Sequence, residues 1–179
     1  MNKKVLVLSG SPRKAGNSEV LCDQFIEGVL ESDHQVEKIF IRDKEINYCI
    51  ACEACQRNPG KCSIDDDMTE ILEKMIGADV IVMATPVYFY TLDAQMKTLI
   101  DRCVARYTEI KNKEFYFIMT AAVERKSMLE RTLECFRGFT DCLPGAAEKG
   151  VVYGTGAWKK GEIEGSPAMK QAYDLGKNV

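Results

Sequence analysis

The sequence predicts a doubly wound α/β domain, in which a five-stranded parallel sheet carries helices on both faces. Three observations lead to this fold class. Short apolar runs alternate with longer amphipathic segments, the apolar runs are continuous, and no stretch has the composition of a linker. A chain of 179 residues suits one domain of ordinary size, so we expect one domain over residues 1–179.

The expected elements follow from hydrophobic periodicity. Strands are expected at 5–9, 36–41, 79–85, 115–121 and 149–154. Helices are expected from a Ser18 cap through Leu30, and at 67–78, 92–107, 127–142 and 166–177. The largest insertion is a cysteine-rich stretch at about 42–66.

Composition excludes several classes of function. A net charge of −3 argues against a nucleic-acid partner, and no apolar run approaches the ~20 residues of a membrane span. The eight cysteines fit a reducing compartment, so we expect a cytoplasmic protein without a disulfide framework. Four of them (Cys22, Cys103, Cys135 and Cys142) are scattered among apolar residues and are expected to be buried and inert.

The stretch "SGSPRKAGNS" at 9–18 follows the first strand and has the residues of an anion-binding loop. Gly10 and Gly16 let the backbone turn closely, while serine, asparagine and arginine side chains donate hydrogen bonds beside a helix N-terminus. The spacing fits neither a P-loop nor a Rossmann fingerprint.

"GSPRKAGNS" resembles the phosphate loop of the flavodoxin-like NAD(P)H-dependent FMN reductases, and two further stretches, at 84–102 and 164–177, extend the likeness. The resemblance implies a flavodoxin-like fold that binds FMN. The implied cofactor-binding residues are Ser9, Ser11, Arg13, Asn17 and Ser18 around the phosphate, and Pro86, Val87, Tyr88, Phe89 and Thr120 beside the ring.

"YCIACEACQRNPGKC" at 48–62 brings four cysteines close together in sequence. The stretch resembles the compact cluster motif of the iron–sulfur flavoproteins, which share this fold. Three alternatives stay open: a [4Fe–4S] cluster, a structural zinc ion or free thiols. The candidate metal ligands are Cys49, Cys52, Cys55 and Cys62.

The sequence and the resemblance together predict an FMN-dependent oxidoreductase. NAD(P)H would reduce the flavin, a small molecule or a protein would accept the electrons, and no side chain need act as acid or base. The first alternative is an iron–sulfur flavoprotein that takes electrons from ferredoxin-like donors; the second, from another class, is a redox sensor. The resemblance also implies a homodimer or homotetramer. Near the predicted ring segment, Asp101 and Arg102 are expected to pair locally.

Overall fold

Five strands pair into one parallel sheet in this computed structural model, which describes residues 2–179. The strands are β1 (Lys4–Ser9), β2 (Gln35–Phe40), β3 (Val80–Pro86), β4 (Glu114–Thr120) and β5 (Ala147–Gly154). The α-helices are α1 (Asn17–Leu30), α2 (Ala54–Arg57), α3 (Met68–Gly77), α4 (Ala94–Arg102), α5 (Glu130–Thr140) and α6 (Pro167–Lys177).

The strand order is β2-β1-β3-β4-β5, and every neighbouring pair is parallel. This order confirms the predicted flavodoxin-like fold. The register aligns Ser9 with Ala84, Pro86 with Thr120, and Thr120 with Gly154. The carboxyl ends of β1, β3, β4 and β5 therefore share one edge of the sheet, and the strand order reverses between β1 and β3, where such folds bind ligands.

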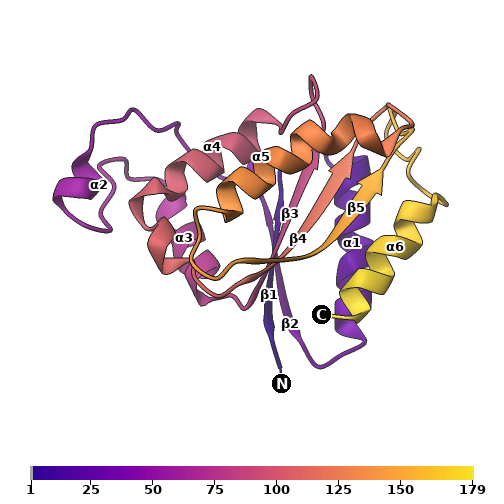
Figure 1. Cartoon of the computed structure of the whole chain (residues 1–179), viewed down its shortest axis with the longest axis horizontal. Helices are drawn as coiled ribbons and strands as arrows, with labels where there is room; N and C mark the ends of the chain where they lie inside the picture. The colour runs from indigo at the N-terminus through magenta and orange to yellow at the C-terminus, as the bar shows by residue number, and fades with distance from the viewer. Residues whose placement is uncertain (1) are drawn as a thin grey trace.

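Alternate strand residues face opposite helical layers, which explains why the strands are continuously apolar. Leu6 and Leu8 of β1 pack in a core with residues of α3, α4 and α5. Val5 and Val7 pack in a second core with residues of α1 and α6. Figure 1 shows these two helical layers on either side of the sheet, and α2 in a loop that projects from one end.

Several predicted helix boundaries were wrong. The helix expected at 127–142 is α-helical only over Glu130–Thr140, because a 3-10 turn occupies Lys126–Leu129. The expected helix at 92–107 stops at Arg102, after which bonds such as Arg106 N–H to Cys103 O tighten the chain into short 3-10 turns. The N-cap of α1 is Gly16 rather than Ser18, because the Gly16 carbonyl already accepts the Val20 N–H. Ser18 consequently lies inside the first turn.

The scattered cysteines divide into two pairs. Cys22 and Cys103 are buried as expected, and burial raises the pKa of the Cys22 thiol to about 12. Cys135 and Cys142 are exposed, so the expectation of burial was wrong for them. Their thiols instead donate to the carbonyls of Arg131 and Gly138, one helical turn earlier.

The helices of residues 2–179 include none with both the length and the apolar character needed to cross a membrane.

Candidate functional site

A cleft of about 280 Å³ opens at the carboxyl edge of the sheet, between the loops that follow β1, β3, β4 and β5. Nine of the ten predicted cofactor-binding residues line it: Ser11, Arg13, Asn17, Ser18, Pro86, Val87, Tyr88, Phe89 and Thr120. The tenth, Ser9, does not line the cleft; it is fully buried at the end of β1, and its Oγ has no hydrogen-bond partner.

The loop after β1 is closed by short contacts within itself. Arg13 N–H donates to Ser11 Oγ at 3.2 Å, and Gly16 N–H donates to Arg13 O at 3.3 Å. A Cβ atom at Gly16 would lie 2.7 Å from Ser11 Oγ, closer than real Cβ atoms come, so a larger residue here would displace the Ser11 hydroxyl group. The loop thus brings the N-terminus of α1, with its unpaired N–H groups, to the cleft.

Ser18 is the residue whose surroundings point most directly to a ligand. Its hydroxyl group is buried but has no hydrogen-bond partner within the described chain, although the residue lines the cleft. A buried hydroxyl without a partner is unfavourable by about 1–3 kcal/mol. An anion at the start of α1 would accept this hydrogen bond.

Arg42 lies just beyond β2, and its side chain holds the loop after β1 in place. The sequence analysis did not identify this residue. Its Nη1 donates to Glu19 Oε2 at 2.6 Å and lies 3.4 Å from the carbonyl oxygens of both Ser11 and Arg13. Its guanidinium also lies 4.5 Å from the centre of the Phe40 ring. Because Arg42 is paired with Glu19, its role is to hold the loop in position. Arg13 is exposed and lines the cleft.

Arg13 and Asn17 also join the loop after β1 to the loop after β5. Arg13 Nη1 donates to Trp158 O at 3.2 Å. The Asn17 amide donates to Lys159 O at 2.9 Å and accepts from Gly161 N–H at 3.0 Å, so both ends of this side chain are engaged. Asn17 therefore orders the cleft wall in addition to lining it.

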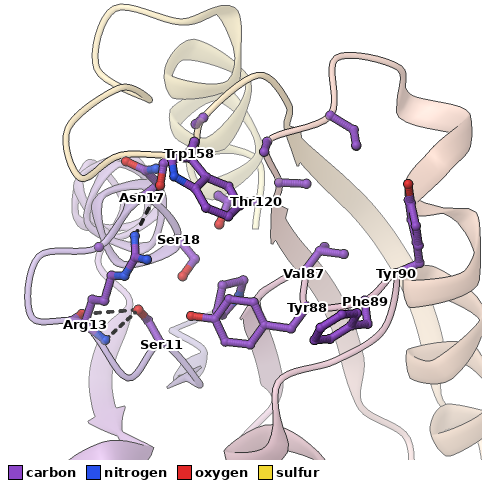
Figure 2. A pocket seen from close by; sticks show the side chains of 16 residues that line it. Ser11, Arg13, Asn17, Ser18, Val87, Tyr88, Phe89, Tyr90, Thr120 and Trp158 are labelled. Carbon is purple, nitrogen blue, oxygen red and sulfur yellow. Dashed lines mark hydrogen bonds between the residues drawn. The ribbon is translucent and has the colours of Figure 1, made fainter.

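Trp158 lines the cleft but was not among the predicted residues. Its side chain is 69% exposed. In Figure 2, Tyr88 reaches from the loop after β3 toward Ser11, across the cleft that Trp158 also lines. The sequence could have indicated Trp158, because this residue follows the fifth strand, whose carboxyl end lies at the same sheet edge as the other loops.

The loop after β3 makes a tight turn at Tyr88–Thr91. The two residues exchange backbone hydrogen bonds of 3.1 Å, and the central residues, Phe89 and Tyr90, have positive φ angles of 51° and 62°. Left-handed conformations are unfavourable for side chains of this size. Backbone strain of this kind gathers at functional sites.

The four clustered cysteines line a second cavity, of about 240 Å³, which shares no lining residue with the cleft. A hydrogen bond with Ser63 lowers the pKa of Cys52. Within residues 2–179, no three histidine, cysteine or acidic side chains stand close enough to share one metal ion.

The donor set nevertheless suits an iron–sulfur cluster. A cubane takes one thiolate at each of four separate iron atoms, so its ligands surround a volume rather than a point. Cys49, Cys52, Cys55 and Cys62 line one cavity and would be the ligands of such a cluster.

The strand order and the cleft at its reversal point define a flavodoxin-like protein with a candidate anion-binding site. Residues 3–137 match the NADPH-dependent FMN reductase family, and the chain belongs to this family. The family match confirms the resemblance seen in the sequence.

Two of the relatives that carry the name iron-sulfur flavoprotein are similar to this chain over about 100 residues. One, from Methanocaldococcus jannaschii, is 46% identical over 99 residues, which cover 55% of this chain and 51% of the relative. The other, from Methanosarcina thermophila, is 45% identical over 101 residues, which cover 56% of this chain and 52% of the relative. The chain thus spans about half the length of these relatives.

A solved structure shares the fold over nearly the whole chain. The FMN-dependent NADH-azoreductase of Bacillus anthracis, in complex with FMN, superimposes with a TM-score of 0.77 at 15% identity, covering 98% of each chain. At this identity the likeness concerns the fold alone.

Proposed function

We propose that this protein is an FMN-dependent oxidoreductase that passes reducing equivalents from NAD(P)H through bound FMN to a small-molecule or protein acceptor. The observation that carries the proposal is the cleft at the carboxyl edge of the sheet, where the buried Ser18 hydroxyl lacks a partner at the start of α1. Family membership supports the same cofactor.

In this proposal, FMN supplies the hydride and electron chemistry when bound. Ser11, Arg13 and Ser18, with the N–H groups at the start of α1, bind the phosphate. Asn17 orders the adjoining loop. The segment Pro86–Phe89 and Thr120 border the flavin ring.

The domain and its location are part of the proposal. Residues 1–179 form one FMN-binding domain with the cysteine-rich insertion at about 42–66, and the eight thiols suit the cytoplasm. A second copy of the chain covers the rim of the cleft, where Phe89 is fully exposed. Light scattering on the purified protein tests this dimer or tetramer.

A test of the FMN site compares two buried serine hydroxyls that both lack a partner. Ser18 lines the cleft, whereas Ser166 caps α6 and does not. S18A should weaken FMN binding roughly tenfold or more, because a hydrogen bond to a charged group contributes about 1.5–3 kcal/mol. S166A should leave binding unchanged.

The measurement is a fluorescence titration of the apoprotein with FMN, followed by anaerobic bleaching of the flavin with NAD(P)H. Binding without turnover in excess acceptor would favour the redox-sensor alternative. If the wild-type protein binds no FMN, the proposed function is wrong.

A second candidate function is suggested by the four thiols around one cavity. We propose that Cys49, Cys52, Cys55 and Cys62 hold a [4Fe–4S] cluster, so that the protein takes electrons from ferredoxin-like donors. The names of the two relatives support this proposal. Iron and acid-labile sulfide, assayed on protein purified without oxygen, should reach about four of each per chain. Protein that binds FMN but takes up no iron would leave the simple reductase.

A further inference from the structure

Arg102, the last residue of α4, lies almost wholly within the protein, with 2% of its side chain exposed. The expected local pair with Asp101 was wrong, since Asp101 pairs with Lys97 instead. Arg102 turns inward to Asp66, whose side chain is 0% exposed. Its Nη1 lies 2.6 Å from Asp66 Oδ2, and its Nη2 lies 2.9 Å from Asp66 Oδ1.

This ion pair sits where the cysteine-rich insertion leaves and rejoins the body of the protein. Arg102 Nη1 also donates to Asn47 O at 2.6 Å, while Asp66 Oδ2 accepts from Asn47 N–H at 2.9 Å. Next to this contact, Glu45 and Asp67 exchange hydrogen bonds of 2.8 and 3.1 Å. Arg102 and Asp66 thus close the base of the loop that bears the cysteines.

The same guanidinium group reaches one of the clustered thiols. Arg102 Nη2 lies 3.6 Å from Cys62 Sγ, and Arg102 lines the cavity together with all four cysteines. The Nε of Arg102 is buried without a hydrogen-bond partner in the described chain. The guanidinium group of Arg102 therefore places a permanent positive charge in the lining of the cysteine cavity.

Burial of an ion pair is a weak source of stability, because desolvation offsets most of the attraction between the charges. Such a pair is better explained by the geometry that it fixes. The planar guanidinium holds a carboxylate, a carbonyl oxygen and a thiol in fixed directions, whereas a lysine ammonium cannot reproduce this fork.

We propose that Arg102 is the positioning residue of the cysteine cavity. It locks the base of the loop through Asp66 and Asn47, and it places a positive charge beside Cys62. The identity of the group held there rests on the proposed iron–sulfur function; the ordering of the loop does not. A cluster bound by four thiolates is an anion, so this charge stabilises its more reduced state.

The first test uses metal-free, reduced protein and hydrogen–deuterium exchange. R102M should raise exchange of the amides at 45–67 by about tenfold or more, while the central strands stay protected. R102K should give a smaller rise. R137M is the matched control, because Arg137 also holds a carboxylate with two nitrogens, that of Glu148, but on β5.

The second test reconstitutes the same proteins anaerobically with iron and sulfide. R102M should retain less iron, and its remaining cluster should have a lower reduction potential than that of wild type. R102K should lose iron but keep most of the potential, because it keeps the charge.

The outcomes separate the two proposals. Wild-type protein that takes up no iron contradicts the iron–sulfur function, while the exchange experiment still judges the role of Arg102. Exchange at 45–67 that is equal in wild type, R102K and R102M overturns the positioning role. If R102M lowered the reduction potential but left amide exchange at 45–67 unchanged, the positioning role would also be wrong. Arg102 would then act on the cluster through its charge alone.

Discussion

Thr85 and Asp93 form a buried pair that joins the two ends of the segment proposed to border the flavin. Thr85 Oγ1 donates to Asp93 Oδ1 at 2.6 Å, and the Asp93 N–H donates to the same hydroxyl oxygen at 3.0 Å. A Cβ atom at Gly10 would lie 2.5 Å from Asp93 Oδ1, so the glycine of the loop after β1 is required by this carboxyl group. The pair therefore connects β3, α4 and the loop after β1.

Burial raises the pKa of Asp93 to about 6, even though hydrogen bonds from Thr85 and from the Met96 N–H lower it. The folded protein therefore holds the proton more tightly than the unfolded chain, whose carboxyl has the ordinary value of 3.8. As the pH rises from about 4 to 6, Asp93 should lower the free energy of unfolding, by up to roughly 3 kcal/mol in total.

D93N should remove this contribution. The difference in unfolding free energy between wild type and D93N, from denaturant titrations at pH 4 to 7, should change through that window and level off above it. T85V, which removes the donor to the ionised carboxylate, should shift the window to higher pH. Parallel curves for wild type and D93N would show that Asp93 titrates normally.

A second prediction concerns the contact between α1 and α6, which depends on two glycines. A Cβ atom at Gly28 would overlap Tyr173 O, and one at Gly176 would overlap Phe25 O. G28A and G176A should each lower the free energy of unfolding by about 1–3 kcal/mol, because overpacking outweighs the gain in helix propensity. Chemical denaturation measures this loss.

Gly138 is the matched control for these two substitutions. It lies in the last turn of α5, is exposed, and an added Cβ would meet nothing within 4 Å. G138A should raise the free energy of unfolding by about 0.5–1 kcal/mol. If all three variants were stabilised alike, close contact between the helices would not explain the glycines.

Much of the fold follows from the sequence because its signals are local. Continuous apolar runs predict strands buried on both faces, and all five expected strands were found. The loop at 9–18 was recognisable for the same reason, since its glycines and short polar side chains are adjacent in the chain. Nine of ten predicted cofactor-binding residues accordingly line one cleft.

The remaining features depend on contacts between distant parts of the chain. Periodicity cannot show that Arg102 turns away from its neighbour Asp101 to reach Asp66, or that Arg42 braces a loop some thirty residues earlier. The unpartnered hydroxyl of Ser18 is equally invisible in the sequence, where serine before a helix is typical of a cap. Trp158 enters the cleft only because β5 ends at the same edge as β1.

The final prediction concerns the turn at Tyr88–Thr91, whose two central residues adopt the left-handed conformation. A two-residue turn of this kind favours Asn-Gly, since these residues tolerate positive φ. Phe89 is 100% exposed and Tyr90 41% exposed, so replacing them removes little buried surface. F89N/Y90G should therefore raise the free energy of unfolding of the FMN-free protein by roughly 1–2 kcal/mol.

F89A/Y90A separates backbone strain from the aromatic side chains, because alanine removes both rings but keeps a Cβ atom at each strained position. We expect this variant to be close to wild type in denaturant, with F89N/Y90G more stable than both. FMN titration of all three proteins then measures what the rings contribute to the cleft, where weaker binding by both variants should indicate that Phe89 or Tyr90 contacts the cofactor. If F89N/Y90G were less stable than F89A/Y90A, the turn would not be strained, and its aromatic residues would need another structural explanation.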